Sequence, residues 1–270
     1  MVQLINKRRH ILVLILVLAF VLAGCSEHAR ARPRLVVLDV GQGDAIYIRT
    51  PSGADLLIDA GRGEQVIEQL SQQMPFSDRS IELAVVTHFD SDHSGGFEQV
   101  LDRLKVTTFA TNGATPNNQT GTDLLAKARQ SGTKYLELQR GTRLEGAGFI
   151  LDVLWPPDAS DPSNAGSIVL LLRTAKQSVL LTGDADGKVE AALLEQHTPL
   201  LAGLLKAGHH GSKTSSTTEF IEAVAGSQAA ISVGANNRYG HPTKETIERL
   251  QAAGYQIKRT DQDGPLTFLL

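Results

Sequence analysis

The feature that most constrains this chain is a dense group of potential metal ligands at residues 87–96, which read Thr-His-Phe-Asp-Ser-Asp-His-Ser-Gly-Gly. Within this segment, four side chains that can bind a cation fall inside six positions: His88, Asp90, Asp92 and His93. A single histidine or aspartate at a strand end is usually structural. Four together are costly to bury without a cation, because each demands hydration or a polar partner.

We expect the loop to serve two adjacent cations. His88 and Asp90 are predicted to bind one of them, and Asp92 and His93 the other. Residues 82–87, which precede the loop, have the apolar pattern of a strand. The Gly-Gly pair that ends the segment lets the backbone turn tightly into a helix.

Apolar runs rich in Val, Ile and Leu alternate with turn residues along the chain, and these runs are typical of strands. Strands are expected at residues 34–40, 45–50, 55–59, 82–87, 149–154, 167–173, 178–182, 203–207, 229–233 and 266–270. Helical spacing appears at residues 65–73, 97–104, 123–131, 186–196, 217–225 and 243–253. Two β-rich halves, each followed by helices, predict an α/β (α+β) domain in which two sheets pack face to face with helices outside.

The N-terminus has the pattern of an export signal. Lys7, Arg8 and Arg9 precede an apolar run at residues 11–21 that is short for a bilayer span. The run ends in Leu-Ala-Gly-Cys25, which resembles the lipobox of bacterial lipoproteins, where the cysteine becomes lipidated. We expect a lipoprotein signal peptide at residues 1–24, a tether at 25–33 and a hydrolase domain at 34–270. The alternative is an N-terminal membrane anchor with an incidental cysteine, and either one predicts an extracytoplasmic, membrane-anchored protein.

Charge and cysteine content narrow the function classes. Removing residues 1–24 takes away three basic residues and no acidic ones, which leaves 23 basic against 29 acidic residues and a formal charge of −6. A general nucleic-acid-binding surface is therefore not expected, although a local basic patch remains open. Cys25 is the single cysteine, so stability must come from core burial rather than from disulfides.

Residues 87–96 resemble the metal-binding signature of the metallo-β-lactamase superfamily, which usually has a histidine where Asp90 stands. The closer resemblance is to the extracytoplasmic hydrolase domain of ComEC-type DNA-uptake proteins and their free-standing relatives. The shared motifs lie at residues 38–45 (LDVGQGDA), 57–61 (LIDAG), 87–96, 180–184 (LLTGD), 205–212 (LKAGHHGS), 232–234 (SVG) and 239–242 (YGHP). The resemblance spans residues 34–270 and implies the four-layer αββα metallo-β-lactamase sandwich.

The resemblance also implies roles for residues beyond the loop. Asp184 would bridge the two metals, the alternative being an aspartate that caps the following helix. His241 would complete the second metal site, with His209 or His210 as the proton donor; the opposite allocation, with His209 as ligand, stays open. Asp59 would orient a ligand histidine from behind.

Departures from the family pattern bear on the metal. Asp90 replaces an imidazole with a hard oxygen donor, and where relatives carry a third histidine for the first metal, this chain offers only Asn164, a weak carbonyl ligand. Fewer imidazoles and no thiolate favour Mn²⁺ over Zn²⁺, although either of these divalent ions is expected to work in both sites. The first metal is expected to be bound more loosely. Nearby Lys206, Lys213, Arg238 and Tyr239 are either solvated surface or contacts for a phosphate.

These features predict hydrolysis of phosphodiesters, with Asp92 orienting a nucleophilic water and a histidine protonating the leaving oxygen. The resemblance to ComEC-type proteins implies extracellular, single-stranded DNA as the substrate and DNA-uptake proteins as partners. One alternative is a cell-surface phosphodiesterase acting on choline-decorated or other phosphate polymers. Another is a non-catalytic surface lipoprotein that binds DNA. A β-lactamase is disfavoured by Asp90 and by the paired His209 and His210.

Overall fold

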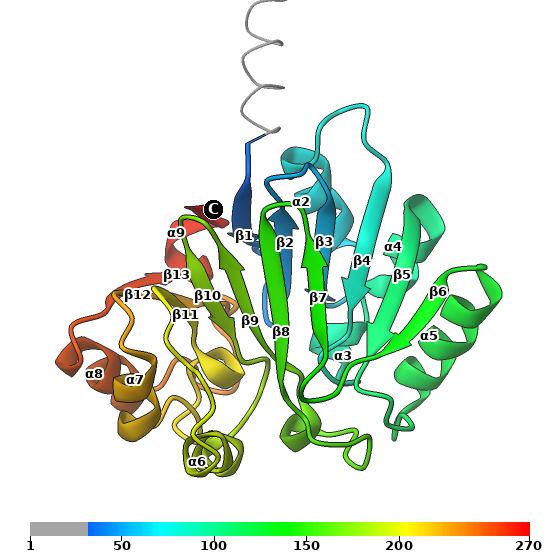
Figure 1. The fold of residues 1–270 in the computed structure, drawn as a ribbon. Helices are drawn as coiled ribbons and strands as arrows, with labels where there is room; N and C mark the ends of the chain where they lie inside the picture. Colours follow the sequence, from blue (N-terminus) through cyan, green and yellow to red (C-terminus); the bar gives the residue numbers. More distant parts are fainter. Residues whose placement is uncertain (1–31) are drawn as a thin grey trace, which may run out of the picture.

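The computed structural model describes residues 32–270 and contains two seven-stranded sheets (Figure 1). The first sheet has the order β14-β1-β2-β3-β4-β5-β6, and its strands are β1 (Arg34–Val37), β2 (Ala45–Arg49), β3 (Asp55–Ala60), β4 (Ser80–Val85), β5 (Lys105–Thr111), β6 (Lys134–Glu137) and β14 (Leu266–Leu269). The second has the order β13-β12-β11-β10-β9-β8-β7, and its strands are β7 (Arg143–Gly146), β8 (Phe149–Trp155), β9 (Val169–Thr174), β10 (Ser178–Leu181), β11 (Leu204–Lys206), β12 (Gln228–Ile231) and β13 (Gln256–Arg259).

Helices cover the outer face of each sheet. The first sheet carries α2 (Gln65–Gln73), α4 (Phe97–Arg103) and α5 (Gln119–Gln130), with the short α3 (Ser91–Ser94) in contact with β3 and α5. The second carries α6 (Gly187–Glu195), α7 (Thr218–Val224) and α8 (Lys244–Ala252). The remaining short elements are α9 (Thr260–Asp263) and the 3₁₀ turns η1 (Asn164–Gly166) and η2 (Gly208–Gly211).

Three apolar cores hold these layers together, and β1 shows how the sequence produces them. Successive side chains of a strand point to opposite faces. Leu35 and Val37 therefore lie in the core between the two sheets, whereas Val36 packs against the helices of the first sheet. A strand buried on both faces reads as a continuous apolar run. The predicted αββα sandwich is confirmed.

The predicted helices are confirmed with small shifts at their ends. The largest shift is in α5, which begins at Gln119 because the side chain of Asn118 accepts a hydrogen bond from the backbone N–H of Gly121 (2.8 Å). Four strands were not predicted: β5, β6, β7 and β13. The last three are the edges of their sheets, where polar side chains replace the apolar pattern.

The predicted signal peptide, Cys25 and residues 25–31 of the tether lie outside the described residues. Within residues 32–270, no helix is both long and apolar enough to cross a membrane.

The topology brings several strand ends to one side of the sandwich. Strands β3, β4 and β5 run parallel in the first sheet, and β10, β11 and β12 run parallel in the second. The segments that follow β4, β10 and β11 contain residues 87–96, Asp184 and the His209–His210 pair. The same side of the sandwich therefore receives candidate ligands from both halves of the chain.

Candidate metal centre

The loop after β4 is held in place by buried contacts on its two sides. The carboxylate of Asp59, at the end of β3, accepts hydrogen bonds from the Thr87 backbone N–H (2.8 Å) and hydroxyl (2.7 Å). The side chain of Phe89 is buried in the core beneath the helices. Gly96 is required because a Cβ there would lie 2.1 Å from the carbonyl oxygen of Ala60. Hydrogen bonds and core packing therefore fix the backbone of this loop, and with it the positions of the candidate ligand side chains.

Four buried polar atoms point to a cation site. His88 Nε2, His93 Nε2, His210 Nε2 and Asp184 Oδ1 are shielded from solvent and have no hydrogen-bond partner. Leaving such atoms unpaired in a protein interior costs about 1–3 kcal/mol each. Imidazole nitrogens and a carboxylate are ordinary ligands of divalent metals. Bound cations would satisfy all four atoms.

The distances place Asp184 at the centre of this cluster. Its Oδ1 lies 3.2 Å from His93 Nε2, and its Oδ2 lies 3.5 Å from His210 Nε2. His88, His93 and Asp184 form one group whose ligand atoms all lie within 4.8 Å of one another. Asp186 caps α6 by accepting from two backbone N–H groups, so the capping role considered for Asp184 belongs to its neighbour.

The loop carboxylates lie beside different histidines of the cluster. Asp92 forms a second group with His93 and His210, again within 4.8 Å, and its Oδ2 is 3.7 Å from His210 Nε2. Asp90 Oδ2 is 3.8 Å from His88 Nε2. The pairs expected from the sequence, His88 with Asp90 and Asp92 with His93, are therefore neighbours in space. One histidine of each pair, His88 and His93, has a ligand atom within 4.8 Å of an Asp184 oxygen.

The buried histidines and carboxylates of the cluster shift the pKa values of one another. Burial lowers the pKa of His93, but the charges of Asp184 and Asp59 outweigh it and hold that pKa well above its ordinary value. Burial opposes ionisation of Asp184, yet the charges of His93 and His210 hold its pKa well below the usual range. Without a metal, the positive charge beside these carboxylates comes from protonated histidines; a divalent cation would supply it instead and leave the ring nitrogens free to bind.

The three later histidines occupy different positions. His210 is buried, and its Nδ1 donates to the carbonyl oxygen of Ser232 (3.0 Å), which leaves Nε2 as a lone pair aimed into the cluster. His209 lies at the rim, where its Nε2 is 3.6 Å from Asp184 Oδ2 and 3.5 Å from the Asn164 side-chain amide. Both have φ near +50°, a strained conformation for residues other than glycine.

His241 lies next to His209, with 5.7 Å between ring centroids, and belongs to none of the ligand groups found among the described residues. The structure thus brings His210 into the cluster and leaves His241 beside it. Asn164 faces His209 rather than Asp90. The ligand role expected for His241 stays a prediction, and His210 has the better geometry for it.

Asp59 stands behind the cluster, as expected. Its Oδ2 accepts from His93 Nδ1 at 2.8 Å, which leaves Nε2 of that ring free for a cation.

The buried pair of Asp44 and Lys206 was not predicted, because Lys206 was expected to be solvated surface or a phosphate contact. Lys206 is 1% exposed rather than solvated; it pairs with the buried carboxylate of Asp44 and donates to the Gly183 carbonyl at 3.2 Å. Burial raises the pKa of Asp44, but Lys206 and His210 outweigh it and hold that pKa well below its ordinary value. The available signal was a lysine at the end of an otherwise apolar strand.

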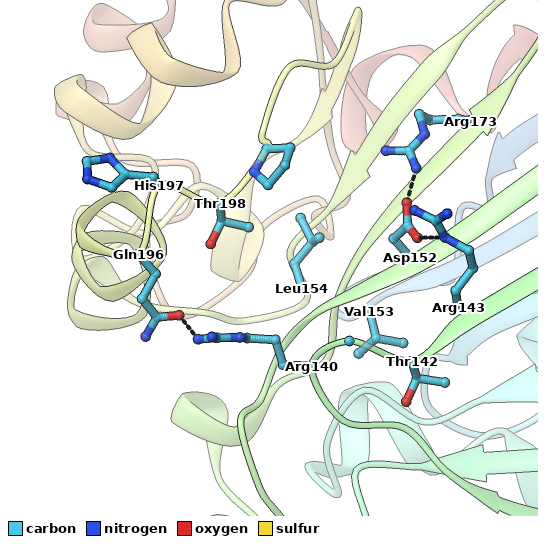
Figure 2. Close-up of a pocket in the computed structure, with 12 residues that line it drawn as sticks. Arg140, Thr142, Arg143, Asp152, Val153, Leu154, Arg173, Gln196, His197 and Thr198 are labelled. Carbon is cyan, nitrogen blue, oxygen red and sulfur yellow. Dashed lines mark hydrogen bonds and ion pairs between the residues drawn. The ribbon is translucent and has the colours of Figure 1, made fainter.

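The cluster opens into a cavity of about 400 Å³, whose wall includes Arg62, Asp92, Asp184, His209 and Tyr239. A second cavity of about 390 Å³ lies elsewhere, over β8, β9 and the end of α6 (Figure 2). Its cations are already paired: Arg143 and Arg173 with Asp152, and Arg140 with Gln196. We therefore place the chemistry in the first cavity.

Comparison with known proteins agrees with this geometry. The model of the metallo-beta-lactamase superfamily matches residues 38–234. The chain is 32% identical over 251 residues to ComE operon protein 3 of Bacillus subtilis, covering 86% of this chain and 32% of that protein. It is 32% identical over 237 residues to competence protein ComA of Neisseria gonorrhoeae, covering 87% of this chain and 32% of that protein. It therefore spans about a third of the length of these relatives.

Two solved structures share the fold. Igni18, a metallo hydrolase from Ignicoccus hospitalis, has a TM-score of 0.58 at 12% identity, covering 88% of this chain and 99% of that one. The metallo-beta-lactamase fold protein YhfI from Bacillus subtilis has a TM-score of 0.58 at 11% identity, covering 87% and 99%. At such identities the likeness concerns the fold alone.

Proposed function

We propose that this chain, which belongs to the metallo-β-lactamase superfamily, is a metal-dependent phosphodiesterase that cleaves DNA outside the cytoplasmic membrane. The observation that carries the proposal is the convergence of unpartnered ligand atoms from His88, His93 and His210 on Asp184, beside a cavity that opens to solvent. The relatives named as competence proteins support DNA as the substrate.

The ligand sets fit two divalent ions, Mn²⁺ or Zn²⁺. His88, Asp90 and Asp184 would hold one, and a second set would hold the other: Asp92, His93, His210 and Asp184. When bound, such ions supply Lewis acidity toward a phosphoryl oxygen and toward water.

The remaining steps fall to side chains at the cavity. Asp92 is positioned to orient the attacking water, because its carboxylate lies in the cavity wall between Arg62 (3.6 Å) and His210 (3.7 Å). Burial lowers the pKa of His209, so its imidazole is neutral at neutral pH. A phosphodiester bound beside it is an anion and favours the protonated ring, which can then donate a proton to the leaving oxygen.

We further propose that Cys25 anchors the chain to a membrane as a lipoprotein and that DNA-uptake proteins are its partners. The lipobox pattern supports the anchor, and the names of the relatives support the partners. Because the chain spans about a third of those relatives, a role in uptake concerns only its hydrolase part.

The test is hydrolysis of a labelled single-stranded oligonucleotide by purified chain loaded with Mn²⁺. We expect cleavage by the wild type and its loss in Asp92→Asn, a substitution that keeps the shape of the side chain. Equal activity of the two would refute the assignment. Turnover of a cephalosporin or of a choline-bearing phosphodiester in place of DNA would point to the other hydrolases. DNA binding by a chain that retains no metal would point to a binding protein.

A further inference from the structure

An exposed aromatic ring stands at the rim of the metal cavity. Tyr239 is 47% exposed and lines the same cavity as Asp184 and His209. Its ring stacks on that of His241, with 6.0 Å between centroids and 18° between planes. Neighbouring rings thus run from Tyr239 through His241 to His209, whose Nε2 lies 3.6 Å from Asp184. The ring lies beside the reaction centre without belonging to the ligand cluster.

The segment that carries this ring is organised by Asn237. The side-chain oxygen Oδ1 of Asn237 accepts from the backbone N–H groups of Tyr239 (3.2 Å) and His241 (3.0 Å). Its amide donates to the carbonyl oxygens of Gly234 (3.0 Å) and His241 (2.6 Å). One side chain therefore fixes the turn on both sides of Tyr239, which holds the ring in place before a ligand binds.

Two arginines lie at this rim. Arg238 places its guanidinium 5.3 Å from the ring centroid and donates to the Tyr239 hydroxyl at 3.3 Å. Arg62 lies in the wall of the same cavity, with its Nη2 3.6 Å from Asp92 Oδ1. Both guanidinium groups therefore bring positive charge to the rim. Anions are attracted to this rim.

We propose that Tyr239 is a stacking platform for an unpaired base next to the scissile phosphate, with Arg62 and Arg238 holding the adjacent phosphates. This inference rests on the proposed function, because it names how the same site selects its substrate. Aromatic stacking is the usual way in which proteins hold single strands without reading their sequence. A paired base inside a duplex has both faces covered, so the platform selects single-stranded DNA. A quaternary ammonium such as choline also suits an aromatic ring, but the two arginines repel it.

The test is binding, measured by fluorescence anisotropy at fixed salt with EDTA present so that no strand is cleaved. Two labelled single strands of equal length are compared, one with bases and one built of abasic sites. We expect Tyr239→Ala to raise Kd for the base-containing strand by about 5- to 150-fold, the size of one base–aromatic stack. The abasic strand should lose far less.

Matched variants separate stacking from other effects. Tyr239→Phe keeps the ring and should stay within about twofold of the wild type. Phe76→Ala removes another exposed ring, which is 78% exposed. Phe76 precedes β4, whereas the metal loop follows that strand, so the two lie at opposite ends of β4. This substitution should leave both Kd values unchanged.

Three results would overturn the platform. Tyr239→Ala could weaken binding of both strands equally, it could leave binding of the base-containing strand unchanged, or glycerophosphocholine could displace that strand from the wild type. Cleavage assays with Mn²⁺ keep the two proposals apart. A wild type that binds through Tyr239 but cuts nothing refutes the nuclease alone, whereas cleavage with the same KM in Tyr239→Ala refutes the platform alone.

Discussion

Replacing Lys206 by methionine should destabilise the fold strongly even without metal. Both partners of the Asp44–Lys206 pair are 1% exposed, so the substitution leaves a carboxylate in the interior without its cation. Removing one partner of a buried pair costs about 3–5 kcal/mol. His210 lies 3.3 Å from Asp44, but its Nδ1 proton is already given to the Ser232 carbonyl. In a domain of this size, the loss corresponds to a fall in Tm of roughly 6–20 °C.

The free energy of unfolding would be measured by urea denaturation at pH 7.5 with EDTA present. The exposed Lys213→Met serves as the matched control and should stay within about 0.5 kcal/mol of the wild type. The double variant Asp44→Asn with Lys206→Met should recover part of the loss, because no unpaired charge remains. If Lys206→Met unfolds within about 1 kcal/mol of the wild type, the pair does not stabilise the interior as we argue.

The same variant has a defined pH dependence. In the wild type, the pKa of Asp44 is lower in the folded chain than in the unfolded chain, so its stabilisation is present above about pH 4 and is lost only below it. Lys206 is the largest cause of this lowering, and burial acts in the opposite direction. Without Lys206, the buried carboxyl should take up a proton at higher pH. The difference in stability between wild type and variant should therefore shrink on acidification from pH 7.5 to 5, and a constant difference would contradict this reasoning.

Three further predictions concern the metal site and its loop. His210→Ala should reduce bound metal, measured by elemental analysis after dialysis, by about one ion per chain, whereas His241→Ala should reduce it less; the reverse order would give the ligand role to His241. When the free ion is present at 100 times its Kd, removing the metal with EDTA should lower the free energy of unfolding by about 3 kcal/mol. An unchanged melting curve would argue against a resident metal. Gly96→Ala should cost about 1–3 kcal/mol in urea denaturation, because the new Cβ meets the Ala60 carbonyl at 2.1 Å. Gly254→Ala is the control for backbone strain alone, because φ there is +81° and no atom lies within 4 Å of the new Cβ. If the two substitutions destabilise the protein equally, the clash with Ala60 does not explain the effect of Gly96→Ala.

Periodicity predicted the layers and motifs predicted the ligand loop, because each of these features depends on residues that are close together in the sequence. The helices follow the spacing of their apolar positions, and the two-sided burial of β1 follows from a continuous apolar run. The edge strands β6 and β7 escaped prediction because half-exposed strands of four residues carry little apolar signal. The choice between His210 and His241 also depends on tertiary structure, since only the Ser232 carbonyl decides which nitrogen of His210 faces the cluster.

The Gly-Gln-Gly-Asp turn after β1 explains why the site needs both halves of the chain. Its contacts reach across to the second sheet: the Gly43 carbonyl accepts from the Ser232 hydroxyl (2.7 Å), and the Gln42 side chain accepts from the Gly234 N–H (3.2 Å). Asp44 adds the pair with Lys206, and its backbone N–H donates to the Asp92 carbonyl (3.1 Å). One turn thus joins the ligand loop of the first sheet to the strand ends that carry His210. Because these contacts form only when the two sheets pack, the ligands converge as a consequence of the completed sandwich.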